Sequence, residues 1–414
     1  ARGFDRQPID LFQTEAITFL SLHYSPLFAP ATAAIVGFAG SFLKAERSGK
    51  ARDLIPGAIC AALLGNFHSY DVLHCFAAAG AYRVVTDVAA RRIDRAGWVR
   101  LILLGAAALP TTAWVFAAYR LDPLFHARAL TRTHTAPLQW LVLGFGLPAG
   151  LAVLGARDRR MAADARRFLG AWIVGVLALA YLPFEFQRKV LMGIHVPIVL
   201  LAGAGLDALV RRLPGDFPRI AAVLGVLLTT PSNVLFVLQE LERAGANVGS
   251  TQYQPYLRVG AIDALEWLGR TARRGDVVVV SPDPTCQLRF PFAAGLPDLA
   301  VWVPARSGLF VHDGHWSETL DYERKLSESN RIFSARTSDQ DRLALLRSAR
   351  ARWLLVDRRL FEGPLRDATG GVLIDPRTGE PTYLPVDWSV ALPGFLQRRW
   401  ESADTLVYEV LDSR

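Results

Sequence analysis

The sequence is poor in the residues and motifs that mark several large functional classes. Its 414 residues include only three cysteines, Cys60, Cys75 and Cys286, which do not make a disulfide framework. It lacks the G-x-x-x-x-G-K-[ST] phosphate loop, the G-x-S-x-G nucleophile elbow and zinc-finger spacings. Basic and aromatic residues do not alternate, so the net charge of +8 does not indicate a nucleic-acid partner. These absences argue against nucleotide-binding, serine-hydrolase and nucleic-acid-binding functions.

What the sequence has instead is long apolar runs. Hydrophobic residues make up 51% of the chain, and they concentrate between residues 26 and 239. Most runs are about 18 to 22 residues long, enough for a helix to cross a hydrocarbon layer of about 30 Å. The sequence therefore predicts a membrane α-helical bundle of about eight transmembrane helices. The candidate spans cover residues 26–43, 54–66, 71–89, 98–119, 136–155, 168–184, 190–209 and 218–239.

After residue 239 the composition becomes that of a soluble domain. Buried strands are predicted at "VVVV" (277–280), "RWLLVD" (352–357) and "TLVYEV" (405–410). A Ser338-x-x-Asp341 capping box opens a helix between two of them. Strands that alternate with helices indicate a small α/β domain. The predicted parts are a stub (1–25), a transmembrane helical domain (26–239), a linker (240–257) and the α/β domain (258–414).

The basic residues predict an orientation in the membrane. Lys and Arg number 17 in one set of alternate connections, 44–52, 83–100, 156–167 and 210–219. They number 5 in the other set, 65–74, 120–136 and 183–189. Because cytoplasmic loops are enriched in Lys and Arg, we expect the first set inside the cell. The stub and the α/β domain are then extracytoplasmic, and the chain is a multi-pass protein of the bacterial cytoplasmic (inner) membrane.

Two polar segments on this predicted outer side have both a functional and a structural interpretation. The segment "GNFHSYD" carries His68 and Asp71. They either cap helices in headgroup water or belong to a functional site, since ionisable residues at membrane depth are costly. The loop 120–135 carries Arg128 and Arg132. These either grip an anionic lipid headgroup, as guanidinium groups grip phosphate, or belong to a solvated loop.

A third such segment is "LPFEFQRKVLMGIHVP" (182–197), which places Glu185, Arg188 and Lys189 between two apolar runs. In the functional interpretation the two cations hold a lipid phosphate, and Glu185 orients Arg188 or binds a sugar hydroxyl. In the structural interpretation the charges snorkel to water and anchor two helix ends. Spacing alone does not decide between the two.

The predicted α/β domain has a polar segment of its own, "VHDGHWSETLDYERK", with His312, His315 and Glu318. The H-x-x-H spacing around Gly314 is not a helical zinc pattern. We therefore predict no metal site, although a divalent cation stays open as a cofactor. A loop that reaches back to the membrane surface and shapes a site fits this segment better.

Four motifs occur in order along the chain: "GNFHSYD", "LPFEFQRKVLMGIHVPIVLLAGAGL", "AIDALEWL" and "GHWSETLDYERK". With the predicted topology, they resemble bacterial multi-spanning glycosyltransferases of the GT-C superfamily over most of the chain. Ser69 stands where the family pattern has proline. The resemblance implies transfer of a sugar from a polyprenyl-phosphate donor to an acceptor on the outer membrane face. A carboxylate would act as general base, and cations such as Arg188 and Lys189 would stabilise the phosphate leaving group.

The family's catalytic acidic residue has no assigned counterpart here. Family members carry it in the first outer loop, after a first transmembrane helix, whereas no span precedes residue 26. The N-terminal segment offers Asp5, Asp10 and Glu15, but we assign the base to none of them. We expect it upstream of residue 1, in a longer enzyme of which this chain is the C-terminal part.

The alternative function is a non-catalytic membrane protein or a transporter of lipid-linked sugars. Transporters bind substrate at broken helices near the middle of the membrane. Pro110, Pro148 and Pro197 lie within predicted spans and keep this alternative open. A membrane-anchored hydrolase ranks below both, because the sequence has no recognisable nucleophile.

Overall fold

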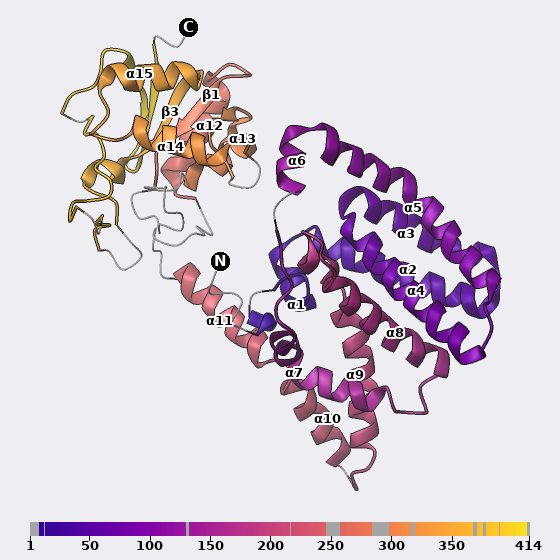
Figure 1. Cartoon of the computed structure of the whole chain (residues 1–414). Helices are drawn as coiled ribbons and strands as arrows, with labels where there is room; N and C mark the ends of the chain where they lie inside the picture. The colour runs from indigo at the N-terminus through magenta and orange to yellow at the C-terminus, as the bar shows by residue number, and fades with distance from the viewer. Residues whose placement is uncertain are drawn as a thin grey trace. The chain divides into compact units, whose positions relative to one another are not determined.

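The structure is a computed structural model that describes residues 8–11, 13–129, 132–215, 217–245, 257–283, 298–315, 319–366, 371–375, 378–388 and 390–411. The chain folds as two compact units, residues 1–238 and 239–414. The first is helical and the second is built on a β-sheet (Figure 1).

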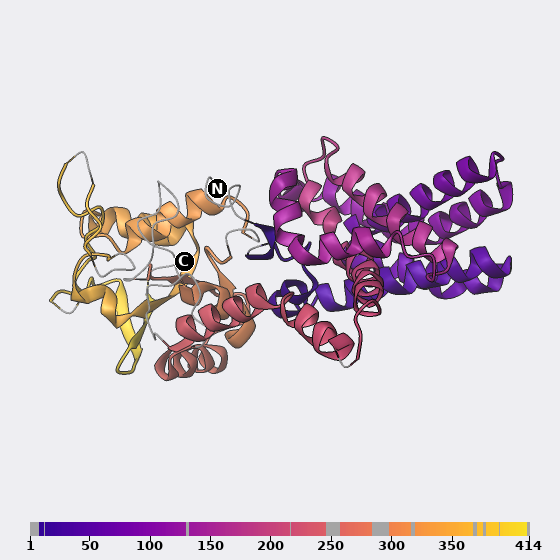
Figure 2. The same cartoon turned by 90° about the horizontal axis from the view of Figure 1, so that it is seen from below.

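Apolar helices make up the first unit, and each predicted span overlaps at least one of them. They are α2 (Phe28–Ser48), α3 (Ile55–Phe67), α4 (Tyr70–Ala90), α5 (Arg95–Leu121), α7 (Leu138–Gly155), α8 (Ala163–Ala180), α9 (His195–Val210), α10 (Phe217–Leu227) and α11 (Pro231–Gly245). The shorter segments are η2 (Ile9–Leu11), α1 (Thr18–Tyr24), η3 (Ala51–Leu54), α6 (Pro123–Ala129) and η4 (Gln187–Leu191). Helices α2 to α5 lie alongside one another in both views (Figures 1 and 2).

The predicted membrane domain is confirmed as a helical unit, with fewer candidate spans than the sequence suggests. Among the described residues, four segments are long and apolar enough to cross a membrane: Phe28–Ser48, Arg95–Leu121, Leu138–Gly155 and Gln187–Val210. A fifth is present if Phe217–Leu227 and Pro231–Gln239, bent by 41°, count as one span. Helix α3 has only 13 residues, whereas a straight crossing needs about 20.

The N-terminal segment is part of the core of the first unit. Ile9, Ala16, Ile17 and Leu20 are fully buried or nearly so, and they pack in the same cluster as the long helices. The sequence predicts an extracytoplasmic stub at residues 1–25, because no membrane-spanning run precedes residue 26. Their apolar side chains, closely spaced around α1, are instead covered by the helices that follow.

Helices α7 and α9 pack with their backbones in close contact. A side chain at Gly155 would collide with the carbonyl of Leu201, and one at Gly205 would collide with the carbonyl of Leu151. Small residues of this kind let helices approach closely where no hydrophobic effect drives them together, as in a membrane. This contact fixes α9, and with it the η4 segment that precedes α9.

A mixed five-stranded sheet forms the second unit, in the order β2-β1-β3-β5-β4. Its strands are β1 (Val277–Val280), β2 (Phe310–Val311), β3 (Ala351–Asp357), β4 (Leu396–Glu401) and β5 (Thr405–Val410). Strand β1 pairs in parallel with β2 and β3, and β5 pairs antiparallel with β3 and β4. The helical segments are α12 (Val259–Thr271), η5 (Asp298–Val301), α13 (Trp302–Ser307), α14 (Tyr322–Ile332), α15 (Asp339–Ser348) and η6 (Arg358–Glu362).

Helices cover both faces of this sheet, which confirms the predicted α/β fold. Val278 and Val280 of β1 pack with Leu265 of α12, whereas Val279 packs on the opposite face with α14 and α15. The three predicted strands are β1, β3 and β5. The predicted capping box is also confirmed, because Ser338 Oγ accepts a hydrogen bond from Asp341 N at 3.1 Å. The sequence does not reveal β2 and β4.

Candidate functional site

Two of the predicted polar loops pair with each other in the structure. Thr133 N donates to the carbonyl of Glu185 at 2.6 Å, and Arg188 N donates to the carbonyl of Thr133 at 2.9 Å. Arg132 Nε lies 2.9 Å from Glu185 Oε2, although both side chains are well exposed. An exposed ion pair contributes little to stability. The backbone bonds are therefore what hold the two loops together, and they place Arg132 and Glu185 beside Arg188.

A group of charged and aromatic side chains surrounds the same place, and we call it the Arg188 cluster. Arg188 Nε lies 3.1 Å from Glu15 Oε1. Lys189 Nζ lies 4.5 Å from the centre of the Tyr70 ring. His68 Nδ1 lies 2.9 Å from Asp71 Oδ2. The members of the cluster are Glu15, His68, Tyr70, Asp71, Arg188 and Lys189.

The local sequence explains why two cations face polar partners inside an apolar unit. Val190, Leu191 and Met192 are completely buried, and they anchor η4 in the core. Gly193 then turns the chain into α9 with φ of +79°, in the left-handed region that favours glycine. Arg188 and Lys189 precede this anchor, so they remain at the margin of the core.

His74 holds the same segment from the side. Its Nδ1 lies 2.8 Å from the carbonyl oxygen of Val190, and its Nε2 accepts a hydrogen bond from Trp172 Nε1 at 2.6 Å. The pairing requires that Nδ1 carries the proton and donates it to the carbonyl. His74 therefore links α4, α8 and η4, and its role is to position the loop.

Burial makes the carboxylates of the cluster dependent on a few cations. The Glu15 side chain is 8% exposed and that of Asp71 is 0% exposed, whereas Arg188 is 36% exposed. The charges of Glu15 and Asp71 also act on each other. Oδ2 of Asp71 faces His68 Nδ1, whereas its Oδ1 and the buried amide of Gln13 make no hydrogen bond within the described part of the chain. Buried polar groups without partners are rare in proteins and call for an explanation.

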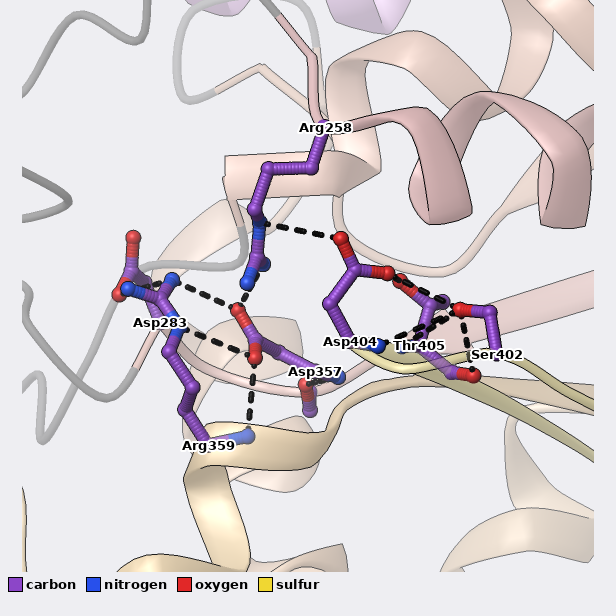
Figure 3. Close-up of polar contacts among 8 residues, drawn as sticks. Arg258, Asp283, Asp357, Arg359, Ser402, Asp404 and Thr405 are labelled. Atoms are coloured by element: carbon purple, nitrogen blue, oxygen red, sulfur yellow. Dashed lines mark hydrogen bonds and ion pairs between the residues drawn. The ribbon is translucent and has the colours of Figure 1, made fainter. Parts of the chain in front are cut away.

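The second unit has a separate polar network at the carboxyl ends of its parallel strands. Figure 3 shows Arg258 and Arg359 pointing at the carboxylate of Asp357, which ends β3. Arg359 also approaches Asp283 beyond β1, at 3.9 Å, and Arg258 approaches Asp404 before β5, at 3.9 Å. Ligands commonly bind at this edge of an open α/β sheet. Here, however, each of the three carboxylates already pairs with an arginine of the network.

This network has a clear structural role. Asp404 lies so close to Gly260, near the start of α12, that any side chain at position 260 would collide with it. Arg258 directly precedes the same helix. The ion pairs thus fasten the start of α12 to the end of β3. We therefore do not treat the network as a ligand site.

His312 and Asp313 follow β2 at the same edge. His312 Nε2 lies 3.1 Å from Glu328 Oε2, and Ser329 Oγ donates to Asp313 Oδ1 at 2.6 Å. Burial raises the pKa of Asp313 to about 7. Burial also lowers the pKa of His312, and the charge of Glu328 only partly offsets this. Both shifts favour the uncharged form of the side chain, for His312 and for Asp313.

The structure leaves some predicted site residues without a described environment. Glu318 lies outside the described residues, as does the side chain of Arg128, whose backbone belongs to α6. His315 is exposed, three residues after His312. Among the described residues, no group of three or more His, Cys, Asp or Glu side chains is arranged to hold a metal ion.

The sequence prediction misses the buried Gln13 and does not identify Glu15 as the partner of Arg188. Glu15 and Arg188 are 173 positions apart in the chain, so periodicity and spacing give no sign of their contact. The available signal was polarity: Gln13 and Glu15 directly precede the apolar run "AITFLSL" (16–22).

Comparison with known proteins indicates a fold but no sequence family. No protein-family model and no curated protein matches the sequence. The structure is similar to that of the arabinofuranosyltransferase AftD from Mycobacteria, solved by single-particle cryo-EM, with a TM-score of 0.54 and 16% sequence identity. The similarity covers 96% of the present chain and 30% of that chain. At this identity the similarity concerns the fold alone.

Proposed function

We propose that the chain belongs to a membrane glycosyltransferase that uses a polyprenyl-phosphate-linked sugar as donor. The sugar passes to an acceptor on the outer face of the bacterial cytoplasmic membrane. The observation that carries the proposal is the Arg188 cluster, which gathers two cations and two buried carboxylates at one end of an apolar helical unit. The order of the four sequence motifs and the fold similarity to an arabinofuranosyltransferase support it.

The chemistry assigns the cations of the cluster to the leaving group. The oxygen of an acceptor hydroxyl forms a bond to the anomeric carbon of the sugar while the bond from that carbon to the phosphate oxygen breaks. The electron pair stays on the phosphate, and the hydroxyl proton passes to a carboxylate base. Arg188, which is partly exposed, binds the phosphate oxygens and stabilises the charge that develops on them. We assign the base to no residue of this chain.

The proposal includes an orientation and eight crossings. Helices α3, α4 and α8 add three crossings to the four candidate spans and the bent pair of α10 and α11. The end with 17 basic residues then lies inside the cell, and the Arg188 cluster and the second unit lie outside.

Replacement of Arg188 tests the proposal. We expect Arg188→Ala, in the full-length protein in its native membrane, to lower the rate of sugar transfer from polyprenyl-phosphate donors by about 100-fold or more, as removal of a group that stabilises transition-state charge does. Arg188→Lys should retain part of the activity, because it keeps the charge but not the two-pronged geometry. The measurement is transfer of radiolabelled sugar from a panel of polyprenyl-phosphate sugars.

Arg211 offers a matched control. It is exposed, pairs with Asp207 on the same helical stretch, and lies at the other end of the unit. Arg211→Ala should leave transfer within about twofold of the wild type, since an exposed pair of this kind contributes little. Equal turnover in Arg188→Ala and wild-type protein at equal expression would remove Arg188 from the donor site.

One structural feature favours the alternative function of a lipid-linked-sugar transporter. Helix α7 is interrupted at Gly146, whose φ of 47° and ψ of −127° are not helical. Discontinuous helices of this kind form substrate sites in transporters. A reconstituted protein that moves polyprenyl-phosphate sugars across vesicles without transferring the sugar would favour this function over the transferase.

A further inference from the structure

The contact between Arg188 and Glu15 has a consequence for the proposed donor site. The guanidinium that would bind a phosphate already has a carboxylate partner, Glu15 Oε1, at 3.1 Å. The other nearby cation, Lys189, lies over the ring of Tyr70 and within 3.5 Å of its hydroxyl oxygen. A phosphate that binds Arg188 must therefore share it with Glu15 or replace Glu15.

Sharing is unfavourable in this place. Glu15 is almost fully buried. A phosphate beside it would put two anionic groups next to one guanidinium in surroundings of low dielectric, where like charges repel strongly. The pair is thus better suited to exchange than to joint binding.

Building on the proposed function, we infer that Glu15 is a displaceable counter-ion that occupies the phosphate-binding face of Arg188 until the lipid-linked donor arrives. In the empty protein it holds the guanidinium at the margin of the core. When the donor binds, its phosphate takes the place of the carboxylate. Glu15 therefore lowers the affinity for the donor, because it competes with the phosphate for Arg188. A residue that merely oriented Arg188 would raise this affinity instead.

Binding measurements with Glu15→Gln test this inference. The wild-type protein and its variants are placed in nanodiscs of zwitterionic lipid and titrated with polyprenyl phosphate. Glutamine keeps the shape of glutamate but cannot compete for Arg188 as an anion. We expect Glu15→Gln to bind polyprenyl phosphate about tenfold more tightly, a typical effect of one charge-assisted contact. Glu15→Ala should shift the affinity in the same direction and serves if the glutamine variant is unstable.

A matched control separates local competition from general electrostatics. Asp122 lies at the end of α5 and caps the next turn through Phe125 N. Asp122→Asn removes the same charge and keeps the capping hydrogen bond, so its affinity should stay within about twofold of the wild type, as for other exposed charges. An equal gain in both variants would contradict local displacement.

The remaining titrations distinguish the two proposals from each other. Weaker binding in Arg188→Ala together with weaker or unchanged binding in Glu15→Gln would refute displacement and leave the donor site at Arg188 intact. Unchanged binding in Arg188→Ala would refute the donor site and the inference with it. Polyprenol, which lacks the phosphate, should show no gain in Glu15→Gln. A gain with inorganic phosphate but not with polyprenyl phosphate would overturn the assignment to a lipid-linked ligand.

Discussion

At the scale of single residues, burial decides which polar groups of this protein carry charge. Asp313 is completely buried, and one of its oxygens has no hydrogen-bond partner among the described residues. The other oxygen accepts a hydrogen bond from Ser329. Desolvation outweighs the hydrogen bonds to the carboxylate, which is why the pKa of Asp313 rises to about 7 from 3.8.

Asp313 should make the second unit less stable as the pH rises. Between pH 3.8 and about 7 the folded protein holds a proton on Asp313 that the unfolded chain has released. The free energy of unfolding therefore falls across this window, by up to about 4 kcal/mol in all. His312 has a lowered pKa and acts in the opposite sense, because its unfolded form gains a proton as the pH falls below 6.5. The charged groups that act on this pair are Glu328, Lys325 and Arg324.

Asp313→Asn isolates the contribution of the carboxyl group. Asparagine cannot ionise, so the free energy of unfolding of the variant, relative to wild type, should increase from pH 4 to pH 7.5. Amide hydrogen exchange of β1 and β3 in the whole protein, corrected for intrinsic rates, measures this local stability. Parallel pH profiles for the two proteins would contradict the raised pKa.

At the scale of elements, an ion network joins three helices at the end of the unit away from Arg188. Arg83 of α4 is almost fully buried and pairs with Glu46 of α2, with Asp87 of its own helix, and with Asp94, which caps α5. Arg100 of α5 pairs with the same Glu46. The network holds α2, α4 and α5 in a fixed arrangement.

Arg83→Ala should destabilise the helical unit by about 3 kcal/mol, because it removes the buried cation that pairs with Glu46, Asp87 and Asp94 and leaves Arg100 as the remaining partner of Glu46. For a unit of this size the expected fall in Tm is roughly 6 to 12 °C. Thermal unfolding in detergent micelles measures it. Arg92→Ala is the control, since Arg92 is exposed in the turn that follows α4. Similar Tm values for the two variants would show that the network does not stabilise the helical unit.

The elements themselves were largely predictable, whereas their contacts were not. Apolar runs located the long helices, and three runs of β-branched and apolar residues located β1, β3 and β5. Strand β4 escaped because "LQRRWE" is an exposed edge strand with little apolar pattern. The partnership of Glu15 with Arg188 escaped because it depends on tertiary packing across 173 positions. Eight crossings were expected from hydropathy, although α3 has 13 residues, fewer than a straight crossing needs.

At the scale of the whole helical unit, charge is divided between two ends. Helix α2 has 21 residues and so is about 30 Å long. Its first residue, Phe28, contacts His68 of the Arg188 cluster. Its last turns bring Glu46 to Arg83 and Arg47 to Asp164. The loops rich in arginine thus gather at one end and the Arg188 cluster at the other, and the positive-inside rule predicts that the first end faces the cytoplasm.

This orientation predicts which positions a membrane-impermeant thiol reagent reaches in intact cells. Thr378 is exposed in the second unit, and Ala162 is exposed in the arginine-rich connection before α8. Thr378→Cys should be labelled in intact cells, whereas Ala162→Cys should be labelled only after the cells are made permeable. Both variants are made in Cys286→Ser protein, because Cys286 lies outside the described residues. That protein supplies the background, since Cys75 is buried and Cys60 is half-buried. The reverse pattern would place the Arg188 cluster inside the cell, where an acceptor on the outer face could not reach a sugar bound to it.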